Sequence, residues 1–127
     1  MKFGVCYDLA KADFIARLGY DYIEGHVTTI AGMSDDEFNV LAEQIDSLPI
    51  KVEASCVLFP GHLKVVGPDV DYDAISKYLD IAFPRLERLG VQPVVFGSGG
   101  ARTVPEGFDR ALAWHQMISV GRLLAQK

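Results

Sequence analysis

The chain has 127 residues, of which 50% are hydrophobic and 23% are charged, a balance typical of one globular domain. Its 12 basic and 17 acidic residues give a net charge of -5, and no basic run occurs, which argues against binding to nucleic-acid phosphates. No apolar stretch approaches the ~20 residues of a membrane span, and the N-terminus lacks a signal-peptide core, so we expect a cytoplasmic protein that does not bind membranes.

Strands and helices alternate along the chain in four units. We expect strands at residues 2–7, 22–25, 50–58 and 93–96, and helices at 9–18, 34–48, 71–89 and 108–125. Residues 26–33, 59–70 and 97–107 are expected loops. Ser34 and Glu37 form a capping box, Gly19 and Gly90 are helix stops, and Pro84 should kink the third helix. This alternation predicts a parallel sheet, with any chemistry at the carboxyl ends of the strands.

The polar residues of the inner strands indicate which kind of parallel sheet this is. Period-two alternation places Tyr22, Glu24 and His26 on one face of the second strand. In the third strand it places Glu53 and Ser55 on one face and residues 52, 54 and 56 on the other. A sheet covered by helices on both faces needs apolar residues on both, whereas a barrel interior accepts polar ones. We therefore expect an α/β fold, a parallel (βα)4 half of a TIM (β/α)8 barrel over residues 1–127, because a full barrel needs about 250 residues. A flavodoxin-like open sheet is the alternative.

The two cysteines fall in the first and third expected strands. If strand order follows the sequence, two strand spacings, about 9.6 Å, separate the Cα atoms of Cys6 and Cys56, too far for a disulfide. We expect two reduced, mostly buried thiols.

Several side chains are candidates for chemistry. Glu24 and His26, two apart at the end of the second strand, could bind a divalent metal or act as an acid/base pair. The simpler interpretation is a hydrogen-bonded glutamate and an exposed loop histidine. Glu53 lies deeper in its strand and is expected to serve a structural role. His62, beside Lys64, could reach a substrate or simply be solvated, and residue 115 is expected to be structural.

The segment FGSGGAR, residues 96–102, is a candidate ligand loop. Gly97 and its neighbouring glycines let backbone N–H groups approach an anion or a sugar, with Ser98 beside them, and Arg102 adds a fork of donors. The segment lacks the GK[ST] of a P-loop and the third glycine of a dinucleotide fingerprint. A tight turn between strand and helix is the alternative.

The segments LGYDYIE, LFPGHLKVVGPDVDYDAI and AFPRLERLGVQPVVFGSGGARTVPEGF together resemble the sugar phosphate isomerase/epimerase family, one of the xylose isomerase-like TIM barrels of the AP endonuclease family 2 superfamily. The resemblance spans the chain but only the first four units of the family. It implies an enzyme that uses Mn, Mg, Co or Zn to move a proton beside a sugar carbonyl, with metal ligands mainly from strands five to eight. Glu24 matches the glutamate that ends the second strand in the family, and His62 lies where many relatives have a different polar residue.

The expected function follows from this resemblance: the N-terminal portion of a metal-dependent sugar or sugar phosphate isomerase/epimerase, inactive by itself and without its own metal. Its substrate contacts would come from Glu24, His62, Gly97, Ser98 and Arg102. One alternative is a non-enzymatic homo-oligomer that binds a small phosphorylated or sugar ligand through residues 97–102. In another, two copies close a barrel and bind metal through Glu24, His26 and His62. Unpaired edges at the first and fourth strands favour self-association.

Overall fold

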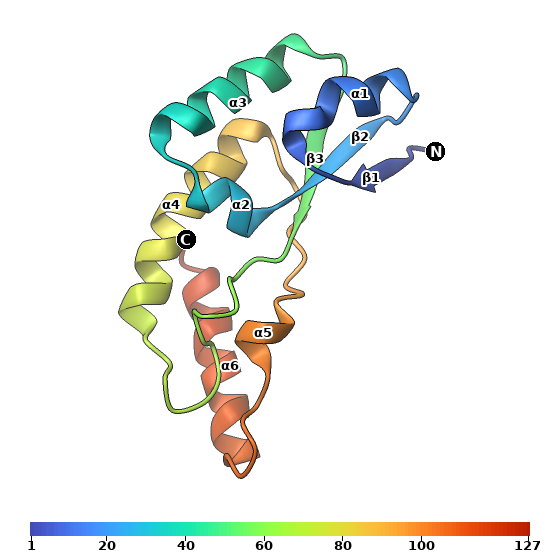
Figure 1. Cartoon of the computed structure of the whole chain (residues 1–127). Helices are drawn as coiled ribbons and strands as arrows, with labels where there is room; N and C mark the ends of the chain where they lie inside the picture. Colours follow the sequence, from blue (N-terminus) through green and yellow to red (C-terminus); the bar gives the residue numbers. More distant parts are fainter.

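The computed structural model describes residues 1–127. In chain order its elements are β1 (Gly4–Cys6), the 3₁₀ turn η1 (Leu9–Lys11), α1 (Ala12–Arg17), β2 (Tyr22–His26), α2 (Val27–Gly32), α3 (Asp35–Ser47), β3 (Lys51–Cys56), α4 (Tyr72–Leu89), α5 (Gly99–Arg102) and α6 (Arg110–Leu124) (Figure 1). None of the helices is both long and apolar enough to cross a bilayer.

The three strands form one parallel sheet in the order β1-β2-β3, which confirms the expected α/β fold with a parallel sheet. The prediction of a fourth strand at residues 93–96 is wrong. Only one bridge, from Val94 to Ser55, joins this segment to β3. Pro93 has no N–H to donate, and β3 turns away at Val57, whose φ of 53° lies in the left-handed region. Residues 93–96 and β3 therefore pair at this one bridge only.

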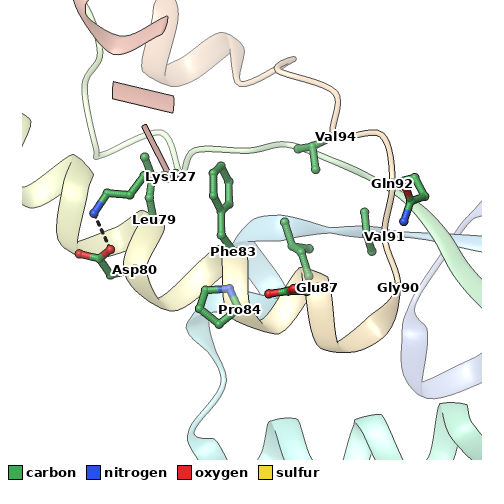
Figure 2. A pocket seen from close by; sticks show the side chains of 11 residues that line it. Leu79, Asp80, Phe83, Pro84, Glu87, Gly90, Val91, Gln92, Val94 and Lys127 are labelled. Atoms are coloured by element: carbon green, nitrogen blue, oxygen red, sulfur yellow. Dashed lines mark hydrogen bonds and ion pairs between the residues drawn. The ribbon is translucent and has the colours of Figure 1, made fainter. Parts of the chain in front are cut away.

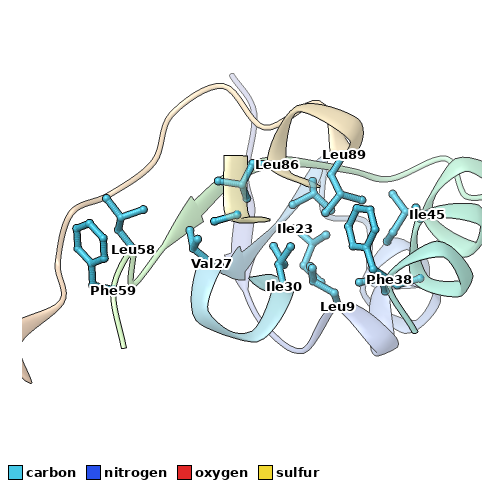
Figure 3. Packing of buried hydrophobic residues seen from close by; sticks show 14 of the residues in the cluster. Leu9, Ile23, Val27, Ile30, Phe38, Ile45, Leu58, Phe59, Leu86 and Leu89 are labelled. Atoms are coloured by element: carbon cyan, nitrogen blue, oxygen red, sulfur yellow. The ribbon is translucent and has the colours of Figure 1, made fainter. Parts of the chain in front are cut away.

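One face of the sheet is covered by helices and the other is open. Ile23 and Val52 project into the helix-covered face and are fully buried, and Val27 and Ile30 of α2 pack in the same cluster (Figure 3). The apolar stripe predicted for the 34–48 helix is buried there too, at Phe38, Leu41, Ala42 and Ile45. On β2, Glu24 is half-buried and His26 is exposed, as expected for the open face.

A β-bulge corrects the predicted faces of the third strand. Ile23 pairs with Val52, but the next residue, Glu24, pairs with Ala54, so β3 contains one extra residue at Glu53. Beyond a bulge the alternation of faces reverses. Residue 55 is therefore buried on the helix-covered face, and residue 56 joins Glu24 on the open face, opposite to the expectation. Glu53 finds its partner in Lys2, at 2.6 Å.

The helix ends follow the sequence signals where those signals are strong. The Ser34–Glu37 capping box is present, Asp71 caps α4, and Gly90 ends it with a φ of 80°. α4 is one continuous helix through Pro84. The expected loop at 26–33 is wrong, because α2 occupies most of it, and this helix has no side-chain cap to predict it. The burial of its apolar side chains against the core outweighs the weak local signal.

Candidate functional site

Three consecutive strands each end on a residue that can ligate a metal or react. Cys6 is the last residue of β1, His26 of β2 and Cys56 of β3. The Sγ atoms of the two cysteines lie 3.8 Å apart, and one ligand atom from each of the three residues lies within 4.8 Å of the other two. The structure therefore gathers these side chains at the carboxyl edge of the sheet.

Both cysteines are free, as expected, but their sulfur atoms are closer than the Cα spacing suggested. The strand order is as predicted, with β2 between the cysteines, but the estimate used Cα spacing alone. In the register, Cys6 pairs with Glu24 and Cys56 with His26, so both sulfur atoms belong to the open face. Side chains on the inner face of a twisted, barrel-like sheet lean toward one another. The sulfur atoms consequently meet over β2.

The two thiols differ in environment. Cys6 is exposed, contrary to expectation, whereas Cys56 is half-buried. Burial, together with hydrogen bonds to Glu24 and Cys6, raises the pKa of the Cys56 thiol to about 12. In the absence of another charge, Cys56 is thus a neutral thiol beside the Glu24 carboxylate.

A cavity opens next to this cluster. Its volume is about 440 Å³, and its lining residues are Cys6, Tyr7, Asp8, Leu9, His26, Thr29 and Met33. Glu24 and His26 share the open face, as predicted. The two cysteines, expected only to be reduced and mostly buried thiols, lie beside them. The sequence signal that points to them is that both lie near the carboxyl ends of their expected strands, although their contact depends on the bulge at Glu53.

The predicted ligand loop at residues 97–102 folds as a helical turn, α5, with its polar groups engaged. The Ser98 hydroxyl is buried and accepts a hydrogen bond from the Phe59 N–H at 2.8 Å. Arg102 donates from Nε to the Gly97 carbonyl at 2.9 Å, and its guanidinium lies 5.5 Å from the centre of the Phe96 ring. A Cβ at residue 100 would lie 3.2 Å from a backbone atom of residue 61. The close approach of these two segments therefore explains the glycine at position 100.

His62 and the ligand loop lie apart from the strand-end cluster. His62 is exposed in the loop after β3, and neither it nor any residue of α5 lines the cavity beside Cys6 and His26. Lys64, its neighbour, donates to the Gly100 carbonyl at 2.9 Å and so ties this loop to α5. His115 is exposed on α6. The structure thus brings only Glu24 and His26 of the predicted site residues to the strand ends.

Another cavity lies away from this cluster. It measures about 520 Å³ and lies between α4 and residues 90–94, with Phe83 and Val94 on its walls (Figure 2). Two of its charged side chains, Asp80 and Lys127, form an ion pair with each other. It contains no histidine or cysteine and lies away from the carboxyl ends of the strands. We therefore place the candidate site at the Cys6–His26–Cys56 edge.

Comparisons with known proteins give the fold of the chain. No protein-family model matches the sequence, and no curated protein does. Among solved structures, D-psicose 3-epimerase crystallised in the presence of D-fructose is similar with a TM-score of 0.71 and 13% identity, over 99% of this chain and 49% of that one. D-psicose 3-epimerase from Clostridium cellulolyticum H10, with D-tagatose, gives a TM-score of 0.72 and 17% identity, over 99% and 48%. The chain spans about half the length of these structures, and its fold is that of a partial TIM barrel.

Proposed function

We propose that this chain is the N-terminal (βα)4 part of a sugar isomerase/epimerase barrel, and that its open sheet face forms part of the sugar site. The observation that carries the proposal is the pairing of an epimerase-like fold with polar strand ends on the uncovered face. In TIM barrels the carboxyl ends of the strands bear the active site. By itself the chain is expected to be inactive, since it supplies only one part of such a site.

The side chains at this edge suit a polyhydroxylated ligand. Glu24 offers carboxylate oxygens as acceptors for sugar hydroxyl groups, and His26 offers a donor or an acceptor. The adjacent cavity of about 440 Å³ falls within the size range of small-molecule sites. We infer that this wall binds and orients a sugar.

The family resemblance implies a divalent metal, and the candidate ligands of this chain can be compared with what such a metal prefers. Mg²⁺ and Mn²⁺ favour oxygen ligands, whereas the single cluster of three candidate ligands in this chain consists of two sulfurs and an imidazole. These residues do not fit a hard cation. No step of the isomerisation is therefore assigned to a metal held by this chain.

Sugar binding by Glu24 gives the direct test. We expect saturation-transfer NMR to detect D-fructose, D-tagatose or hexose phosphates on the chain, and Glu24→Gln to weaken binding about tenfold, the loss of one charge-assisted hydrogen bond. Glu53→Gln is the matched control, because Glu53 pairs with Lys2 at the bulge of β3 rather than sharing the open face of β2 with His26. Equal binding by both variants, or no binding by the parent chain, would refute the sugar site.

The reading frame after residue 127 tests the barrel itself. We expect four further strand–helix units whose strands end on Asp, Glu or His, and we expect the longer product to epimerise a ketose when supplied with Mn²⁺ or Co²⁺. A longer product that folds, carries such strand ends and leaves every ketose unchanged would contradict the proposed activity.

A homo-oligomer of this half-barrel is the second candidate, and the exposed apolar side chains at both open edges of the structure favour it. In that case a second copy, rather than further chain, covers the edges. Light scattering of the isolated chain tests whether it self-associates, and the activity of the longer product tests the first candidate.

A further inference from the structure

We infer that Cys6, His26 and Cys56 form a three-ligand site for a thiophilic divalent cation, Zn²⁺ above all, with the fourth position open to the adjacent cavity. The inference does not depend on the sugar site. It concerns chiefly the two thiols, which the proposed isomerase function leaves unexplained because a sugar-binding wall needs neither of them.

The spacing of the two sulfurs matches zinc coordination. With Zn–S bonds of about 2.3 Å and a tetrahedral angle, two thiolate ligands of one zinc ion lie about 3.8 Å apart. The Sγ atoms of Cys6 and Cys56 are 3.8 Å apart. A disulfide would need them at about 2.05 Å, and so would require a movement of the strands' ends or a change of rotamer. A tetrahedral ion therefore fits the pair without a shift.

The third ligand is placed by the strand between them. A zinc-bound imidazole nitrogen lies about 3.6 Å from a zinc-bound sulfur for Zn–N bonds of about 2.1 Å. The His26 ring nitrogen lies within 4.8 Å of both sulfurs, and a small rotation of an exposed ring closes the difference. The His26 side chain makes no capping hydrogen bond to α2, so that helix does not occupy its ring nitrogens.

The ligands arise from rigid elements, which favours a preformed site. Each is the last residue of a strand in one parallel sheet, held by the ladders Cys6–Glu24 and His26–Cys56. Sites carried on strands hold their geometry better than sites on loops. Ordering of the chain should therefore cost little when the cation binds.

The donor set selects the kind of metal. Two thiolates and a neutral imidazole balance the charge of a dication, and sulfur donors disfavour Mg²⁺, Ca²⁺ and Mn²⁺ relative to Zn²⁺. Three protein ligands leave one position, and Cys6 and His26 both line the neighbouring cavity. That position would hold a water molecule, as in zinc sites with three protein ligands.

Metal titration of the untagged, reduced chain tests the site. We expect one equivalent of Co²⁺ to produce thiolate-to-cobalt charge-transfer absorption with tetrahedral d–d bands, and one equivalent of Zn²⁺ to abolish both. Cys56→Ser should remove the charge-transfer band and weaken Zn²⁺ binding at least about 100-fold, and His26→Ala should weaken it about 10- to 100-fold. Zn²⁺ should also slow the reaction of both thiols with a disulfide reagent.

Two matched controls and one replacement variant keep the test decisive. His62→Ala and His115→Ala remove exposed histidines outside the cluster and should leave the Zn²⁺ affinity unchanged. If Cys56→Ser fails to fold by circular dichroism, Cys6→Ser at an exposed position gives the answer. Co²⁺ binding without a thiolate band, Zn²⁺ affinity unchanged by either cysteine substitution, or an equal loss in His62→Ala would overturn the site. None of these outcomes bears on sugar binding, which is measured separately.

Discussion

Arg85 is the only charged residue buried in the core, and it joins two helices that are far apart in the sequence. From α4 its Nη1 donates to the carbonyl oxygens of Ile30 at 2.9 Å and Met33 at 2.7 Å, at the C-terminal end of α2. Its Nη2 donates to Asp35 at 2.7 Å, and the guanidinium lies 5.1 Å from the centre of the Phe38 ring. Arg85 thus satisfies carbonyl groups that the end of α2 leaves unpaired.

Arg85→Leu should lower the free energy of unfolding by about 3 kcal/mol, because it leaves buried carbonyl oxygens without donors. Arg88→Leu, one helical turn along α4, is the control. Arg88 pairs with Asp46 where both side chains are about half exposed, and solvent-exposed ion pairs add little to stability. Urea unfolding of the two variants measures the difference. Equal losses would show that Arg85 acts only as a surface charge.

The open face of β2 could be predicted residue by residue, but the cysteine contact could not. Alternation alone places Glu24 and His26 together, and the structure agrees. Cys56 lies on the face opposite to the predicted one because of the bulge at Glu53, and no sequence pattern indicates that bulge. The meeting of two sulfurs across β2 further depends on sheet curvature, a property of the whole sheet rather than of any one residue.

At the level of elements, one glutamine makes two hydrogen bonds to the middle of the long segment between β3 and α4. Gln116 of α6 donates from Nε2 to the Gly67 carbonyl and accepts from the Gly67 N–H at its Oε1, both at 2.8 Å. Tyr78 of α4 adds a hydrogen bond from its hydroxyl to the Leu58 carbonyl at 2.8 Å. The loop is therefore an ordered layer between α4 and α6 (Figure 1).

Gln116→Leu should loosen this loop by leaving a buried backbone donor and acceptor at Gly67 unpaired, at a cost of about 2 kcal/mol. We expect hydrogen exchange to accelerate at least about tenfold at residues 63–67, while the amides of β2 and β3 keep their protection. Gln126→Leu, at an exposed position after α6, should change neither. Uniform acceleration across the sheet would mean that the loop does not open by itself.

Helices with caps and long apolar stripes were predictable, and short elements were not. α3 and α4 each carry a side-chain cap and a buried stripe, and both lie within a residue or two of the expected ends. α2 has six residues and no side-chain cap, and residues 93–96 make one bridge. Contacts with residues distant in the sequence decide the structure of both segments, and local propensity carries no information about such contacts.

At the scale of the whole molecule, the two borders of the sheet remain apolar. In the first strand–helix unit the exposed large side chains include Phe3, Tyr7, Phe14, Leu18 and Tyr20, and in the fourth unit they are Val95, Val104, Leu112 and Trp114. Single exposed apolar residues are ordinary, but sets at both open borders of a sheet indicate surfaces that pack against something. A complete barrel would cover both borders at once.

In the isolated chain a second copy should cover these borders, so light scattering should give about twice the chain mass of 13.9 kDa. Phe3→Asp should shift the protein to monomer. Each Phe buried contributes about 1.5–3 kcal/mol, and a two-fold interface counts it twice, which predicts a more than 100-fold weaker dimer. Val40→Asp replaces an equally exposed residue on α3, away from both borders, and should leave the dimer intact. A monodisperse monomer of the parent chain at about 100 µM would refute self-association, because borders worth this much free energy would pair at that concentration.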